Sequence, residues 1–219
     1  MRLLVAQPNH EPHLEQLLKE LKEPDSFDAV LYPEGYVADE ASVRTLCELA
    51  KTYNKLIITG YRNSNNKDRA LIIHPSGDII LERAKSPMDK QLYHPSIVET
   101  EGLRFGYLLC VELLQGYVGL EGQAESLDFI AHPIGVGMFS EEQFALWIEE
   151  ATRIAVKYNT MIMGTSHADG SYRNCGISIP ISYWIDATGE PIYISSNDTR
   201  SRIINLKTRQ VDILNLGSG

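Results

Sequence analysis

The N-terminal part of the chain alternates short apolar runs with segments of helical periodicity. Residues 2–7 and 28–32 are apolar runs of strand length, whereas residues 11–22 and 39–54 carry their apolar side chains at helical spacing. A strand, helix, strand, helix order is typical of helices packed against a sheet. We therefore predict an α/β layer fold.

The middle of the chain predicts antiparallel strands as well. Residues 55–62, 69–74 and 79–84 are strand-like and are separated by short turn sequences rich in Asn, Ser, Gly and Pro. Two adjacent hairpins indicate a mixed sheet. Further apolar segments predict more strands and a long amphipathic helix that begins with a Ser140/Gln143 capping box. The remaining predicted strands are 96–101, 105–110, 127–132, 160–165, 175–185, 191–195 and 202–206.

Length and charge limit the class of protein. The chain has 219 residues with no repeat, linker or low-complexity segment, so we expect one domain spanning residues 1–219. The net charge of −9 and the absence of a Lys/Arg cluster argue against nucleic acid or an anionic membrane surface as a partner. We find no leader-like or membrane-spanning apolar segment and expect a cytosolic protein.

The cysteines predict neither a disulfide framework nor a metal site. Cys47, Cys110 and Cys175 are an odd, widely spaced set without Cys-x-x-Cys or Cys/His ligand spacing. Cys47 belongs to the apolar stripe of residues 39–54, and Cys175 lies in a predicted strand, so both are expected to pack in the core. Cys110 differs because it ends a buried strand just before a predicted glycine-interrupted helix at 112–125. A helix N-terminus in that place would favour the thiolate.

Three polar residues end predicted strands, namely Glu34, Lys85 and Cys110. Strand ends that share one rim of a sheet can bring a base, a cation and a thiol together. An unperturbed thiol is only about 3% ionised at pH 7, so a carboxylate such as Glu34 is useful as its base. Lys85 and the backbone N–H of Val111 could hold an oxyanion. This set is suited to acyl transfer.

At these residues the chain resembles the nitrilase, or carbon–nitrogen hydrolase, superfamily. The similar segments are Leu31-Tyr32-Pro33-Glu34, the Gly77 to Lys85 stretch and Cys110-Val111-Glu112. Gln7 at the end of the first strand, the Trp147 to Asn159 helix and the segments Asn174-Cys175-Gly176-Ile177-Ser178 and Thr188-Gly189-Glu190 extend the resemblance over nearly the whole chain.

The resemblance implies a four-layer α-β-β-α sandwich with mixed sheets. It also implies hydrolysis of a non-peptide linear amide through a cysteinyl thioester, without cofactor or metal, by a chain that forms a homodimer. On this template Cys110 is the nucleophile, Glu34 the general base and acid, and Lys85 the residue that stabilises the tetrahedral intermediate. N-acyl transfer and nitrile hydrolysis are lesser alternatives within the same chemistry.

Several assignments stay open at the level of sequence. Lys90 is an alternative to Lys85. The second glutamate of the family has no clear counterpart, since the nearest candidates are Glu99 and Glu101, and its role could instead fall to Tyr93 or to no residue. Tyr93, Glu112 and His132 are the further candidates for contact with substrate.

Other classes of protein compete with this interpretation. An isochorismatase-like hydrolase also uses Asp, Lys and Cys, but it requires an Asp where this chain has Gln7, and a class I glutamine amidotransferase requires glycines around the cysteine. A catalytically silent binding or sensor protein on the nitrilase fold is the alternative from outside enzymes.

Overall fold

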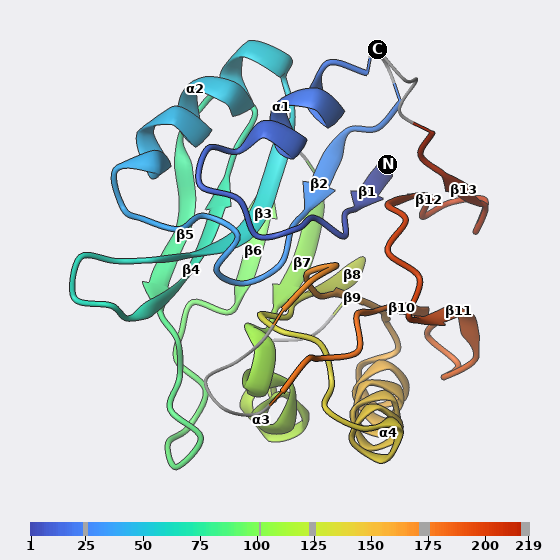
Figure 1. Ribbon diagram of the computed structural model, residues 1–219. Helices are drawn as coiled ribbons and strands as arrows, with labels where there is room; N and C mark the ends of the chain where they lie inside the picture. The colour runs from blue at the N-terminus through green and yellow to red at the C-terminus, as the bar shows by residue number, and fades with distance from the viewer. Residues whose placement is uncertain (24–25, 101, 123–125, 171–175, 216–219) are drawn as a thin grey trace.

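Two β-sheets stacked face to face, with helices on both outer faces, form the protein (Figure 1). The computed structural model describes residues 1–23, 26–100, 102–122, 126–170 and 176–215. The predicted four-layer α-β-β-α sandwich with mixed sheets is therefore confirmed. The helices are α1 (Glu15–Leu21), α2 (Ser42–Tyr53), α3 (Leu113–Gly119) and α4 (Glu141–Tyr158).

The first sheet carries α1 and α2 on its outer face (Figure 1). Its parallel strands β1, β2 and β3 are extended by the two predicted antiparallel hairpins on one side and by antiparallel strands from the C-terminal part of the chain on the other. The strands, in spatial order, are β13 (Val211–Ile213), β12 (Arg202–Asn205), β1 (Arg2–Val5), β2 (Ala29–Leu31), β3 (Leu56–Arg62), β4 (Asp68–Ile73) and β5 (Ile79–Ala84).

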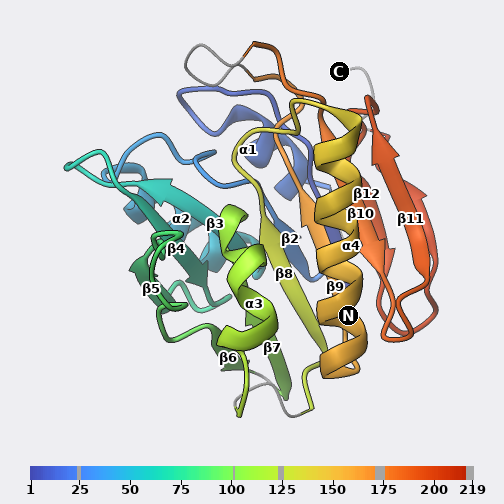
Figure 2. The same cartoon turned by 90° about the horizontal axis from the view of Figure 1, so that it is seen from below.

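The second sheet is covered by α3 and α4, which lie next to one another on its outer face (Figure 2). It also has a parallel centre, β7, β8 and β9, with antiparallel neighbours on both sides. The strands, in spatial order, are β11 (Pro191–Ser196), β10 (Ile181–Ile185), β9 (Met161–Thr165), β8 (Phe129–Pro133), β7 (Leu103–Tyr107) and β6 (Ile97–Thr100).

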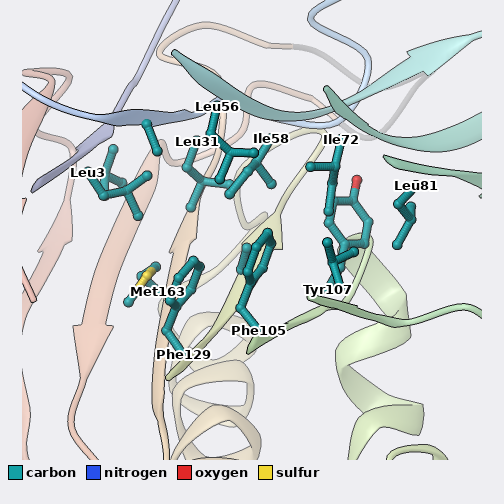
Figure 3. Packing of buried hydrophobic residues seen from close by; sticks show 14 of the residues in the cluster. Leu3, Leu31, Leu56, Ile58, Ile72, Leu81, Phe105, Tyr107, Phe129 and Met163 are labelled. Atoms are coloured by element: carbon teal, nitrogen blue, oxygen red, sulfur yellow. The ribbon is translucent and has the colours of Figure 1, made fainter. Parts of the chain in front are cut away.

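Three apolar clusters separate the four layers. The central cluster lies between the sheets and takes side chains from both, with Leu31 and Ile58 of the first sheet facing Phe105 and Phe129 of the second (Figure 3). The rings of Phe105 and Phe129 stack at 4.7 Å. The other two clusters lie between each sheet and its own pair of helices. Both faces of each sheet are thus buried, which explains why the central strands are continuous apolar runs.

The sequence pattern located most elements, and the differences have local causes. Ser140 caps α4 by accepting a hydrogen bond from the Gln143 backbone N–H, as predicted. The α1 helix begins only after Leu14, whose φ of 57° breaks the helix. The cysteine strand ends at Tyr107 and not at Cys110. Strand β13 was not predicted, because it has three residues, half-buries Val211 and leaves Ile213 exposed.

Some expectations fall on residues outside the described ranges, namely those for Glu101, Asn174 and Cys175. No helix within the described residues is both long enough and apolar enough to span a bilayer.

Candidate active site

Glu34, Lys85 and Cys110 line one cavity of about 480 Å³. Glu34 follows β2 and Lys85 follows β5, whereas Cys110 follows β7 of the other sheet. In the first sheet, β2 and β5 are separated by β3 and β4. The three residues therefore do not meet because their strands are neighbours in one sheet. They meet because the two stacked sheets end at the same side of the sandwich.

Glu34 and Lys85 form a buried ion pair. The carboxylate Oε1 and the ammonium Nζ are 2.7 Å apart, and their side chains are 8% and 20% exposed. Burial raises the pKa of Glu34, and the charge of Lys85 offsets part of that rise. Burial alone lowers the pKa of Lys85, but the negative charge of Cys110 in its ionised form and that of Glu34 outweigh it and raise the pKa above its usual value. Lys85 thus stays charged, and Glu34 is the group that can gain a proton.

The cysteine stands in a tight turn that presents its side chain to the cavity. Cys110 opens a 3₁₀ turn, Cys110–Glu112, and has a φ of 52°. This left-handed conformation is unfavourable for a residue with a side chain and is held by the surrounding structure. His132 is one of the groups that hold it, because its Nε2 donates to the Cys110 carbonyl oxygen at 2.9 Å.

The thiol is the resting form of Cys110. Burial and the charge of Glu34 raise the pKa of the thiol to about 12, although Lys85 and a hydrogen bond from the Gly135 backbone N–H act in the opposite direction. The expectation that a helix N-terminus favours the thiolate is therefore wrong. The carboxylate of Glu34 hydrogen-bonds the thiol, which lowers the pKa of Glu34 in part, so Glu34 is placed to accept the proton of the sulfur.

Glu112 fixes the two halves of the site relative to one another. Its carboxylate makes a two-pronged ion pair with Arg83, with both N–O distances at 2.7 Å. It also accepts the backbone N–H of Ser86 at 2.6 Å and that of Leu109 at 2.7 Å. Ser86 follows Lys85 and Leu109 precedes Cys110, so one carboxylate links the segments that carry Lys85 and Cys110.

The three sequence candidates for substrate contact are not on the cavity wall. Glu112 is fully buried and occupied by Arg83, which gives it a scaffold role. His132 is also fully buried, with its Nδ1 hydrogen-bonded to the hydroxyl of Tyr183 at 2.5 Å. Tyr93 is 41% exposed and is tied to Ser86 through its backbone N–H.

The geometry distinguishes the alternatives for the lysine and the second carboxylate. The Lys90 side chain is 62% exposed and points to Asp89, so Lys85 is the lysine at the cavity. Glu99 is a surface partner of Arg104. Asp68 at the start of β4 supplies the further carboxylate of the cavity wall.

Sequence reasoning missed most of the remaining cavity wall. Asp68 is paired there with Arg62 at 2.9 Å, and His10 also lines the cavity. Val111 lines it beside the nucleophile, where its N–H was expected. In the sequence, the only signal for Asp68 and Arg62 is their position at the ends of a predicted hairpin. Gly135, Val136, Gly137, Met138, Phe139, Gln143 and Trp147 complete the wall on the side of the second sheet.

Comparison with known proteins assigns the fold. No family model matches the sequence, and no curated protein matches it either. Solved structures do match. A carbon–nitrogen hydrolase from Helicobacter pylori G27 is 15% identical, with a TM-score of 0.74 over 95% of this chain and 90% of that one. A Saccharomyces cerevisiae member of branch 10 of the nitrilase superfamily is 14% identical, with a TM-score of 0.71 over 93% and 88%.

A third similar structure is a variant of the amidase from Nesterenkonia sp. AN1 in complex with butyramide. It is 15% identical, with a TM-score of 0.70 over 96% of this chain and 94% of that one. The chain therefore has the fold of the carbon–nitrogen hydrolase, or nitrilase, superfamily, as its resemblance in sequence predicts.

Proposed function

We propose that this protein is a cysteine-dependent hydrolase that cleaves the carbon–nitrogen bond of a linear, non-peptide amide through a thioester. One observation carries the proposal: Glu34, Lys85 and Cys110, from two different sheets, converge on one cavity. Structures with the same fold include carbon–nitrogen hydrolases and an amidase.

The first half of the reaction forms the thioester. Cys110 Sγ attacks the amide carbonyl carbon while its proton passes to Glu34, whose raised pKa suits it to take that proton. Negative charge develops on the carbonyl oxygen, where the ammonium of Lys85 and the Val111 N–H stabilise it. Glu34 then gives the proton to the leaving nitrogen, the C–N bond breaks, and ammonia or an amine departs.

The second half of the reaction restores the thiol. Glu34, now a carboxylate again, takes a proton from a water molecule as that water attacks the thioester carbonyl. The C–S bond breaks, a carboxylic acid leaves, and the proton on Glu34 returns to Cys110. Protein groups and water supply every proton in this sequence.

The cavity wall favours a small amide with an apolar acyl chain. Met138, Phe139 and Trp147 provide apolar surface on one side of the cavity. The acidic and basic residues of the wall form ion pairs, Glu34 with Lys85 and Arg62 with Asp68. A neutral substrate leaves these pairs intact. Short aliphatic amides, including the butyramide bound by the Nesterenkonia amidase variant, are the first candidates.

The test measures ammonia released from a series of short aliphatic amides by the wild-type protein and by Cys110→Ala. We expect turnover of at least one amide that disappears in the variant. Turnover that survives Cys110→Ala would overturn the cysteine mechanism. If no amide is turned over although Cys110 reacts readily with iodoacetamide, the catalytically silent alternative is favoured.

We also infer that the protein forms a homodimer through the outer face of α3 and α4. Four large apolar side chains are exposed on these helices: Leu114, Val118, Leu146 and Val156. Exposed apolar surface on neighbouring helices is typical of a protein–protein contact. Light scattering should give twice the chain mass, and Leu146→Glu should reduce it. A wild-type protein that is monomeric at micromolar concentration would contradict this inference.

A further inference from the structure

The loop between β8 and α4 passes beside the reactive cysteine and is rich in glycine. A Cβ atom on Gly135 would lie 2.8 Å from Oε2 of Glu34, and one on Gly137 would lie 1.8 Å from the carbonyl oxygen of Ile179. Glycine is therefore required at Gly137, and a side chain at Gly135 would displace the Glu34 carboxylate. Because glycine has the widest backbone freedom, this loop needs contacts from outside to fix its conformation.

The end of β9 and the residues that follow it provide those contacts. The backbone N–H of Ile134 donates to Thr165 O at 2.9 Å. The carbonyl of Gly135 lies 2.5 Å from Nδ1 of His167. A carbonyl oxygen can only accept, so His167 Nδ1 carries the proton. The peptide groups on either side of the Ile134–Gly135 peptide are thus held by the end of β9 and the residues after it. Gly135 and Cys110 line the same cavity, and a hydrogen bond from the Gly135 N–H lowers the pKa of the Cys110 thiol.

His167 is itself held in place and kept neutral. It is 1% exposed, and its ring stacks on that of His10 at 3.7 Å with an angle of 12°. Burial, together with the nearby His10, lowers the pKa of His167 to about 4. At neutral pH the ring therefore carries a single proton, and the Gly135 carbonyl keeps that proton on Nδ1.

We propose that His167 is a positioning residue for the nucleophile: it orients Gly135 so that the backbone N–H of Gly135 points at the sulfur of Cys110. The inference rests on the proposed function in so far as Cys110 is the nucleophile. Hydrogen bonds to the charged form favour that form, so this contact makes the thiolate easier to reach. The other titratable groups at the sulfur are Glu34 and Lys85, and those around His167 are His10 and Asp169.

Two variants separate the hydrogen bond from the shape of the ring. His167→Phe keeps the ring stacked on His10 but has no donor, whereas His167→Asn places an amide N–H close to the position of Nδ1. The measurement is the rate of iodoacetamide alkylation at Cys110, followed by mass spectrometry from neutral to alkaline pH. Cys47, which lies far along the chain in α2, serves as the internal reference.

We expect His167→Phe to shift the alkylation profile of Cys110 upward by about one pH unit, which is about tenfold slower at a given pH. His167→Asn should restore most of the rate. Unchanged alkylation in a folded His167→Phe protein would overturn the proposal. An equal loss in both variants would do the same, because it would point to ring packing and not to the donor.

A measurement on the wild-type protein keeps the test decisive if His167→Phe does not fold. The amide signal of Gly135 in a ¹⁵N-resolved NMR spectrum should move when Cys110 is alkylated, and an amide signal that does not move contradicts the hydrogen bond to sulfur. Neither experiment requires a substrate. Failure to find amide turnover would therefore contradict the proposed function but not the role of His167. A failed His167 experiment would likewise leave the proposed function in place.

Discussion

Two buried glutamates belong to the same site and differ in how fully they are hydrogen-bonded. Glu112 accepts four hydrogen bonds, two from Arg83 and two from backbone N–H groups. Glu34 faces only the ammonium of Lys85 and the thiol of Cys110, and its pKa is raised. A saturated carboxylate serves as scaffold, because every donor around it favours the ionised form. A sparsely bonded one is left free to exchange a proton.

The largest expected effect follows from Glu34→Gln. The amide keeps the shape of the side chain but cannot take the proton of Cys110, so we expect turnover to fall by about 10²–10⁴-fold. The free energy of unfolding should fall less than in Glu112→Gln, because the Lys85 side chain left without its partner is 20% exposed, whereas that of Arg83 is 5% exposed. Steady-state ammonia release and urea denaturation measure the two quantities on the same preparation. Full activity in this variant would remove Glu34 from the mechanism.

The matched substitution at the other carboxylate should act mainly on stability. Glu112→Gln leaves the buried guanidinium of Arg83 without its charge partner, and breaking a buried pair in this way costs about 3–5 kcal/mol of unfolding free energy. Turnover should fall as well, because the single oxygen of the amide cannot accept from both backbone N–H groups, those of Ser86 and Leu109. If Glu34→Gln and Glu112→Gln lowered turnover and the free energy of unfolding in the same proportion, the division into a proton-exchanging Glu34 and a scaffold Glu112 would be wrong.

A double variant serves as the control for Glu112. Replacing Arg83 by Met together with Glu112 by Leu removes both charges, and paired removal of this kind is often much less costly than removal of one partner. We expect the double variant to unfold at higher urea concentration than Glu112→Gln while remaining less active than wild type. A double variant that is less stable than Glu112→Gln would contradict an uncompensated Arg83 as the cause.

The smallest expected effect concerns pH. Burial lowers the pKa of His132 to about 4, so between that value and the ordinary value near 6.5 the unfolded chain binds more protons than the folded one. Stability due to neutral His132 is therefore present above about pH 6.5 and is lost as pH falls towards 4, by about 1.4 kcal/mol per pH unit within that window. His132→Gln should show a shallower fall between pH 6 and 5. Equal slopes would contradict the assignment.

Apolar periodicity predicted an α/β fold and most of its strands, and the resemblance to nitrilases implied the four layers. The strand before Cys110 was predicted to end at Cys110, whereas it ends at Tyr107. Buried runs identified the strands before Glu34, Lys85 and Cys110, and the resemblance to nitrilases put these residues in one site. The pattern could not show that Glu34 and Lys85 come from one sheet and Cys110 from the other, because that depends on how the sheets stack.

Long-range polar pairs were the least predictable part. Arg83 and Glu112 are far apart in the chain, and only the packing of β5 against the cysteine turn brings them together. The same holds for His167 and Gly135. The thiolate prediction failed for a related reason. The segment after Cys110 is a 3₁₀ turn beside a buried carboxylate, and the desolvation of the sulfur depends on neighbours that no local pattern specifies.

The central apolar cluster also bears on the stage of folding at which Glu34, Lys85 and Cys110 come together. The apolar inner face of each sheet is exposed to solvent until the other sheet packs against it. An intermediate with one sheet formed would hold the base and the cation, or the thiol, but not the whole set. Recovery of Cys110-dependent amide turnover during refolding would therefore time the docking of the two sheets, and would do so later than any signal from backbone structure alone.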